Sequence, residues 1–392
     1  MHAMDTAQRR ARLAVRHRLA HEARTADVVR VVRSMVALHA TDPATVFLST
    51  AARGHGLTPG DLEAALYDRR ELVRLLGMRR TMFVVPTELV PVLQAACADA
   101  LAVTQHRNYT RLLSKAGVGD GDTAAWLDEV AEETHRALLE AGSATGAQLG
   151  KLVPRLATKV DPTPEKAYSK PGAITTWVLV LLGAQGRIVR GRPGGTWAGS
   201  QYRWEPIESW LPAGVPAIPL VEARATLLRA WLRAFGPAPF SDLVWWTGWS
   251  QRDVTAALTG VQTVEVDLDG VPGLLLADDL EPVAEPEPWA ALLPHLDPTP
   301  MGWKSRDWYL GPHGPALFDR FGNIGPTVWW NGRIVGGWAQ RRDGELAWRL
   351  LEEVGADADT AITAEAERMR AFYGEVRAIP RFRTPLEKEL SG

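Results

Sequence analysis

The sequence predicts a mainly α-helical fold with β elements, organised as three tandem winged helix-turn-helix units followed by a C-terminal β-rich, barrel-like module. Three observations lead to this prediction. A pattern of helices followed by a two-stranded ribbon recurs three times before residue 289. Beyond that point the chain becomes rich in Trp, Gly and Pro and reads as short strands. Its 392 residues are too many for one small core, so about two to four domains are expected.

The first predicted unit covers residues 1–118. Apolar residues recur at helical spacing in four segments, which we assign as helices: 7–20, 25–39, 43–53 and 59–69. Thr58 followed by Pro59 is a common helix start, because Thr caps free backbone N–H groups and Pro fits the first turn. Residues 72–86 then read as two short strands with a turn near Gly77, which completes the winged-helix outline.

The second and third predicted units repeat this order of elements. In residues 119–210 we expect helices at 123–140, after Thr145 and at 171–184, then strands at 186–191 and 196–204 around Pro193-Gly194. In residues 211–288 we expect helices at 220–235, after Pro239 and after Ser250, then strands at 261–266 and 274–276 around Asp269-Gly270. The three segments share this outline although their sequences differ.

The C-terminal module is assigned to residues 289–392. Asn331-Gly332 lies between two apolar runs and predicts a type I′ hairpin, because both residues adopt positive φ readily. A further strand is expected from Glu345, and a helix at 359–374 closes the module. Trp329, Trp330 and Trp338 alternate along the hairpin strands, so some of them must face a partner or solvent.

Charge is distributed unevenly along a chain whose formal net charge is only −2. Residues 1–118 carry 17 Lys and Arg against 10 Asp and Glu, and residues 151–205 carry 9 against 3. Two separate basic blocks favour a polyanionic partner, which the net charge would hide. Because no run of about 18 uncharged apolar residues is present, we expect no membrane span and a cytoplasmic protein.

Metal-dependent chemistry has little support in the sequence. The lone cysteine, Cys97, excludes internal disulfides and cysteine-built zinc sites. His295 and Asp297 could resemble a pair of ligands, but two ligands without a third are a weak signal. No paired carboxylate cluster for a two-metal nuclease is visible. We therefore expect no metal and no cofactor.

The segment Leu38–Pro43 joins two of the predicted helices. Proline disfavours the helical conformation of the preceding Asp42, so a corner is expected here. His39, Thr41 and Asp42 could point together into a cleft at this corner. The structural alternative is that Asp42 or Thr41 caps the second helix and the histidine is satisfied within the fold.

The basic stripe of the helix at 7–20, the basic ribbons and the hairpin tip are the candidate DNA contacts, because arginines bind phosphates and a two-stranded ribbon fits a groove. The candidates are Arg9, Arg12, Arg16, Arg74, Arg79, Arg80, Arg190, Arg192, Trp330, Asn331 and Arg333. Trp245, Trp246 and Trp249 are instead assigned to the core, because aromatic side chains on helices dominate cores.

Several of these segments together resemble the winged-helix DNA glycosylases typified by AlkZ and YcaQ. The resemblance rests on Leu38–Pro43, the ribbon Arg79–Pro86, Leu293–Pro298 with Arg306-Asp307, and Phe321–Trp338. It implies winged helices and a β module around double-stranded DNA. It also implies excision of N7-alkylated purines, including bulky adducts and interstrand crosslinks, and a place in self-resistance to a DNA-alkylating natural product. We expect such an enzyme to act as a monomer.

The catalytic corner departs from the family pattern. Family members carry Gln-x-Gln or Gln-x-Asp where this chain has His39-Ala40-Thr41. Either His39 accepts a proton from water while Thr41 holds that water, or the chain binds DNA without the chemistry. Asp42 could orient His39 or stabilise positive charge if it faces the cleft, and the alternative for Asp42 is a helix cap. Without a lysine at the corner, a monofunctional glycosylase is expected, and a non-catalytic winged-helix DNA-binding or regulatory protein is the alternative.

Overall fold

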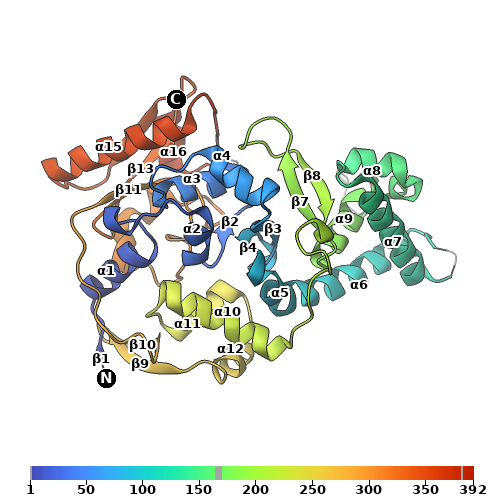
Figure 1. The fold of residues 1–392 in the computed structure, drawn as a ribbon, viewed down its shortest axis with the longest axis horizontal. Helices are drawn as coiled ribbons and strands as arrows, with labels where there is room; N and C mark the ends of the chain where they lie inside the picture. Colours follow the sequence, from blue (N-terminus) through green and yellow to red (C-terminus); the bar gives the residue numbers. More distant parts are fainter. Residues whose placement is uncertain (1, 120, 164–169, 381–382) are drawn as a thin grey trace.

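The computed structural model describes residues 2–119, 121–163, 170–380 and 383–392, which form a mixed α/β architecture (Figure 1). The N-terminal part contains α1 (Thr6–Arg16), α2 (Val28–Ser34), α3 (Pro43–Arg53) and α4 (Pro59–Glu63), with a sheet of β2 (Leu38–His39), β4 (Met82–Pro86) and β3 (Leu72–Leu76) in that order. Both strands of the predicted ribbon are confirmed. The helix expected at 59–69 consists of α4 and a π-helical turn, Ala64–Asp68.

A long helical run leads into the next part of the chain, and sequence reasoning assigned no element there. It consists of α5 (Val90–Leu93), a π-helical segment (Gln94–Ala98) and α6 (Asp99–Lys115). By length and composition, Thr87–Lys115 could cross a membrane. In this fold it packs against other helices: α5 contacts α10 (Leu220–Phe235), and α6 contacts α7 (Thr123–Ala141).

The second and third predicted units have the expected elements. After α7 follow α8 (Gly146–Leu152), the short pair β5 (Lys159–Val160) and β6 (Gly172–Ala173), α9 (Thr175–Ala184), and the hairpin β7 (Ile188–Pro193) with β8 (Tyr202–Pro206). After α10 follow α11 (Phe240–Thr247), α12 (Gln251–Leu258), β9 (Thr263–Leu268) and β10 (Val271–Leu276), with β1 (His2–Ala3) beside β9. The predicted caps are present, since Thr145 caps α8 and Ser250 caps α12. The winged-helix assignment itself stays a prediction.

The C-terminal part is an open sheet covered by helices. Its strands are β11 (Ala290–Leu293), β12 (Thr327–Trp330), β13 (Arg333–Gln340) and β14 (Leu346–Leu350), in this order and all antiparallel. Its helices are α13 (Asp307–Leu310), α14 (Gly314–Leu317), α15 (Ala356–Tyr373) and α16 (Pro385–Ser391). Because β11 and β14 do not pair in the described sheet, the expectation of a barrel is wrong.

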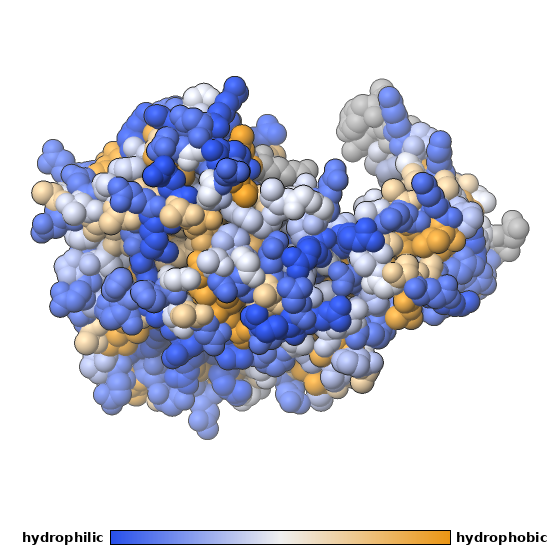
Figure 2. Space-filling view, turned by 45° about the horizontal axis from the view of Figure 1, so that its top comes forward, coloured by the Kyte–Doolittle hydropathy of each residue, from blue (hydrophilic) through white to orange (hydrophobic). Residues whose placement is uncertain are grey.

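The described residues form two large apolar cores and a small cluster of Met4, Val266, Leu268 and Leu275, and this division differs from the four predicted segments. One apolar core joins residues between 13 and 97 with residues between 189 and 390, so the first unit, the third unit and the C-terminal module pack as one main body. A second core is built from residues between 113 and 188. This α7–α9 lobe stands beside the main body and is joined to it through α6 (Figure 1). Figure 2 shows the surface hollowed between the two parts.

The corner at Leu38–Pro43 joins a strand to a helix and not two helices. The helix α2 ends at Ser34, Val36 has a φ of 62°, and β2 follows directly. In β2, Leu38 pairs with Val84 and His39 pairs with Phe83. The predicted helix over 25–39 is therefore too long at both ends. The helix over 43–53 is confirmed, and Asp42 caps it.

Candidate active site

His39 lines a pocket of about 550 Å³ between the N-terminal sheet, α11 and the C-terminal part. The other lining residues come from four further segments of the chain: Arg79, Thr81, Trp245, Met301, Arg306, Phe318, Phe321, Gly322 and Asn323. Cationic and aromatic side chains dominate this wall, and no carboxylate is among the described residues that line it. Such a surface suits a phosphate backbone and a planar base.

The β2–β4 pairing holds His39 at the wall of the pocket. Its ring meets the ring of Phe83 edge to face, with 5.5 Å between the centroids. Its Nδ1 is buried and has no hydrogen-bond partner in the described structure. Burial lowers the pKa of His39, and together with the smaller effects of the nearby His295 and Arg79 it brings that pKa to about 3. At neutral pH the imidazole is therefore uncharged.

Unlike His39, neither Asp42 nor Thr41 is among the described residues that line this pocket. Asp42 accepts a hydrogen bond from the backbone N–H of Ala44 at 3.0 Å, so its capping role is confirmed. The Oδ2 atom of Asp42 lies 3.8 Å from Nδ1 of His295. Thr41 is exposed and is not among the described residues that line the pocket. The structure thus brings His39 near His295 and does not bring Thr41 into the same cavity.

His295 sits on a loop that α3 holds firmly. Thr45 donates a hydrogen bond to the carbonyl of His295 at 2.8 Å. Two residues further, Asp297 is paired with Arg53 through Nη2 at 2.7 Å, and both side chains are fully buried. Burial lowers the pKa of His295 to about 4, and neither of its ring nitrogens has a hydrogen-bond partner in the described structure. Asp297 is therefore engaged by Arg53, and the pair suggested by the sequence does not converge as metal ligands.

Two arginines form the cationic side of the pocket. The guanidinium of Arg79 lies 4.3 Å from the ring centroid of Trp245, and that of Arg306 lies 5.2 Å from the same ring. Burial and the charge of Arg306 lower the pKa of Arg79, which nevertheless remains a cation at neutral pH. Arg79 and the exposed Arg80 have φ values of 52° and 60°, at the tip between β3 and β4. The tip of this ribbon therefore belongs to the site.

Sequence reasoning did not assign Trp245, Phe318 and Phe321 to this site. Trp245 was expected in the core with Trp246, but only Trp246 is buried. A single sequence gave no signal that these side chains meet, because they lie more than 200 residues from His39 along the chain. Arg306 carried a weak signal, since its segment contributes to the family resemblance.

The arginines of α1, which were expected to contact DNA, make structural contacts within the protein instead. Arg12 is 1% exposed, donates to the carbonyl of Glu281 at 2.6 Å and lies 3.3 Å from the carboxylate of Asp279. Arg16 contacts the same carboxylate at 2.7 Å. Arg9 is buried with its guanidinium 4.2 Å from the ring of Trp308. These side chains fasten α1 to the main body, so we do not assign them to DNA.

The ribbon arginines other than Arg79 and Arg80 differ among themselves. Arg74 is 2% exposed, so its guanidinium does not reach the surface where a phosphate contact was expected. Arg190 is half-buried and stacks on Trp204, whereas Arg192 pairs with Asp68 at 2.8 Å. Arg192 is the most exposed of these three residues, but its guanidinium is already paired with the carboxylate of Asp68.

The hairpin tip between β12 and β13 forms the predicted turn, with φ values of 45° at Asn331 and 79° at Gly332. Oδ1 of Asn331 accepts a hydrogen bond from the backbone of Trp289 at 2.8 Å. A Cβ atom at Gly332 would lie 2.7 Å from the Cβ atom of Arg10, so the tip lies tightly against α1.

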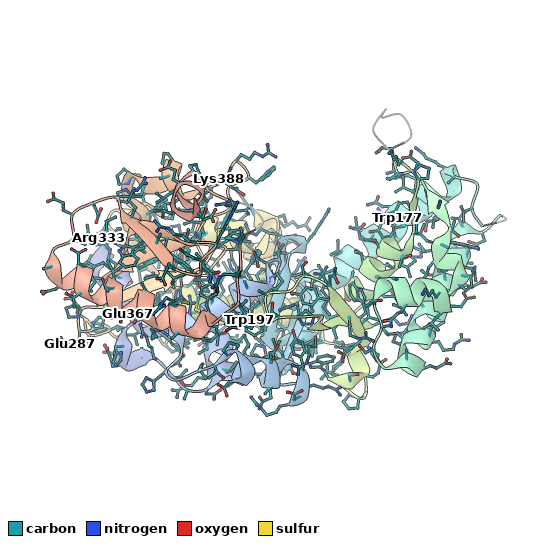
Figure 3. All side chains as sticks on the ribbon, turned by 90° about the horizontal axis from the view of Figure 1, so that it is seen from above. Trp177, Trp197, Glu287, Arg333, Glu367 and Lys388 are labelled. Atoms are coloured by element: carbon teal, nitrogen blue, oxygen red, sulfur yellow. The ribbon has the colours of Figure 1, made fainter. Side chains whose placement is uncertain are left out.

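The two other hairpin candidates are also held by the fold. Arg333 pairs with Glu352 at 3.1 Å, and Trp330 is half-buried. Figure 3 shows Arg333 on the main body, far across the molecule from Trp177 of the α7–α9 lobe. The tip is therefore a packed part of the main body and not a free probe.

Comparison with known proteins identifies the class. A family model described as DNA glycosylase AlkZ-like matches residues 32–372, and the molecule is accordingly a DNA glycosylase of DNA repair. The chain belongs to the AlkZ-like DNA glycosylase family, as the sequence resemblance implied.

One solved structure shares the whole fold. It is the DNA glycosylase AlkZ of Streptomyces sahachiroi, which superimposes with a TM-score of 0.72 at 20% sequence identity and covers 96% of this chain and 99% of its own. A search of curated protein sequences found no match.

Proposed function

We propose that this protein is a monofunctional glycosylase that releases N7-alkylated purines from double-stranded DNA, with the His39 pocket as its active site. The observation that carries the proposal is an uncharged histidine in the wall of a cationic and aromatic pocket. This histidine occupies the position where the resemblance to AlkZ-like enzymes places the catalytic motif.

The chemistry required at the pocket is modest. Alkylation at N7 makes the purine a cation, which weakens the glycosidic bond before the enzyme acts. The protein then has to stabilise the positively charged sugar and place a water molecule beside it. An imidazole with a pKa of about 3 is a weak base, but it can hold the water by a hydrogen bond and accept its proton late in the reaction.

The arginines of the pocket contribute by binding the DNA backbone. Arg79 and Arg306 would repel a cationic base that lay beside them, so we assign them to the phosphates flanking the lesion. Their stacking on Trp245 fixes the direction of both guanidinium groups. Arg80, which is exposed at the same ribbon tip, extends this phosphate-binding surface.

Asp42 and His295 act on His39 indirectly. Asp42 fixes the start of α3, and its second oxygen faces His295 at 3.8 Å. His295 in turn lies close enough to His39 to lower its pKa. We therefore assign both as positioning residues. Thr41 lies outside the pocket, and we assign no step to it.

The remaining features support a monofunctional enzyme that accepts large lesions. No lysine is among the described residues that line the pocket, so the covalent Schiff base needed for strand cleavage has no nucleophile there. The hollow between the main body and the α7–α9 lobe (Figure 2) offers a face for a duplex. We extend the proposal to bulky adducts and interstrand crosslinks, in a cytoplasmic monomer that protects its host from a DNA-alkylating natural product.

A non-catalytic DNA-binding role is the second candidate, and the position of Thr41 favours it, because the two polar residues of the family motif do not meet in one cavity. An excision assay separates the two. Duplex DNA containing N7-methylguanine should lose the base faster with the protein than without it. Tight binding without release above the spontaneous rate would establish the non-catalytic role.

A further inference from the structure

A second cavity, of about 200 Å³, lies where the α7–α9 lobe meets the main body. Strands β3 and β4 and helix α6 form one side, and α9, β7 and β8 form the other. Its walls are mostly apolar and include Leu76, Met82, Leu101, Leu179, Ile188 and Trp204. It is separate from the His39 pocket, with which it shares no lining residue.

The unusual feature of this cavity is Arg74. Its side chain is 2% exposed, and none of its three guanidinium nitrogens has a hydrogen-bond partner in the described structure. The guanidinium lies 4.4 Å from the ring centroid of Tyr202, whose own hydroxyl is also buried without a partner. A ring face attracts a cation, but it does not satisfy five N–H donors.

A buried guanidinium without an anion is strongly unfavourable, and buried donors in native proteins almost always have partners. Arg80 and Arg190 also line the cavity, and the lining residues described include no carboxylate. Among the described lining residues, the buried guanidinium of Arg74 therefore has no counter-charge, and the two neighbouring arginines add to the positive charge of the cavity. A ligand can supply the counter-charge.

We propose that this cavity binds a small organic anion with an apolar body, whose carboxylate or phosphate group pairs with Arg74. The apolar walls contact the apolar body of the ligand, and the guanidinium of Arg74 pairs with its charged group. At about 200 Å³ the cavity is smaller than the ~300–1,000 Å³ of sites for drug-sized ligands, so a short aliphatic or aromatic acid fits. A DNA phosphate fits poorly, because flanking sugars cannot follow it to a side chain that is 2% exposed.

Octanoate and 1-octanol test this site on the full-length protein, because they share an apolar body and differ in charge. Titration calorimetry should show octanoate binding more tightly by about tenfold or more, as expected for a charge-assisted hydrogen bond in an apolar site. Arg74→Met, which keeps the volume and removes the charge, should bring the two affinities within about twofold of each other. Arg33→Met is the matched control, since Arg33 is exposed and pairs with Glu88 at 2.5 Å away from the cavity.

Val180→Trp provides a second variant that leaves Arg74 in place. Val180 lines the cavity, and the larger side chain should fill it and abolish binding of both ligands. The proposal is overturned if octanoate binds wild-type protein no better than octanol, or if Val180→Trp or a folded Arg74→Met retains the preference. Displacement of octanoate by a short undamaged duplex would assign Arg74 to DNA and also overturn it. None of these binding measurements depends on glycosylase activity, so the anion site can fail or hold independently of the proposed function.

Discussion

His39 and Phe83 are paired residues of β2 and β4, and their rings meet edge to face at a centroid distance of 5.5 Å. This pairing fixes the imidazole at the wall of the pocket and buries its Nδ1 atom. The same burial keeps the ring uncharged, since it lowers the pKa of His39 to about 3. The position and the protonation state of the proposed catalytic group therefore have one structural cause.

The pH dependence of excision follows from this protonation state. A histidine with its ordinary pKa near 6.5 would lose activity as the pH falls from 7 to 5.5. With the pKa of His39 at about 3, the single-turnover rate should stay nearly level over that interval. The measurement is base release from N7-methylguanine DNA between pH 5.5 and 8, with spontaneous release subtracted at each pH. A titration of the rate near pH 6.5 would contradict the buried, uncharged state.

Arg79 should contribute one phosphate contact to DNA binding. Replacement by glutamine removes the charge, so the slope of log affinity against log salt concentration should become shallower by about 0.9. Fluorescence anisotropy with an undamaged duplex at several salt concentrations measures this slope. Arg33→Gln is the control, because Arg33 is equally cationic, lies outside the pocket and pairs with Glu88. Equal slopes for wild type and Arg79→Gln would remove Arg79 from the interface.

The Arg53–Asp297 pair should be essential for the loop that carries His295. Both side chains are fully buried, and Ser49 also donates to Asp297 at 2.6 Å. Asp297→Asn leaves the guanidinium without its anionic partner, which should cost about 3–5 kcal/mol of unfolding free energy. Urea unfolding measures the loss. Asp307→Asn is a control at an exposed carboxylate of the same region, and it should cost much less. A loss below about 1 kcal/mol for Asp297→Asn would contradict this role.

Stability should fall in mild acid because buried histidines are held uncharged. Burial lowers the pKa of His17 well below its usual range and that of His295 to about 4. Below pH 6.5 the unfolded chain takes up protons that the folded protein does not, so stability declines as the pH falls toward 4. Each histidine contributes a slope of up to about 1.4 kcal/mol per pH unit.

Urea unfolding at pH 7, 6 and 5 measures this slope. His295→Gln should reduce it, whereas His21→Gln, which alters an exposed residue, should leave it unchanged. A stability that does not vary between pH 7 and 5 would show that the buried histidines have their ordinary pKa values.

Local chemistry explains which elements could be predicted from the sequence. Capping residues such as Thr145 and Ser250 mark helix starts through their own hydrogen bonds, and the Asn331-Gly332 turn depends only on the φ values that its two residues allow. These signals lie within a few residues of the element they define. The strand at Leu38–His39 has no such signal, because its two residues are too few for an apolar pattern to distinguish a strand from the end of a helix.

The candidate site was predicted only in part, because its other members come from distant segments. His39 was identified from the corner and the family resemblance, whereas Trp245 and Phe318 reach it through packing that no local pattern records. The burial of Arg12 has the same kind of cause, since its partner Asp279 lies 267 residues away in the sequence. An arginine pattern alone does not distinguish a phosphate contact from a buried structural cation.

Release of N7-methylguanine by His39 variants under single-turnover conditions tests whether the His39 pocket is the active site. His39→Ala should reduce the enzymatic rate by about a hundredfold or more while DNA affinity stays within about threefold of wild type. Thr41→Val serves as the matched control and should keep nearly the wild-type rate, since Thr41 is exposed and lies outside the pocket. A His39→Ala protein that releases the base at the wild-type rate, after subtraction of spontaneous release, would contradict the assignment of this pocket as the active site.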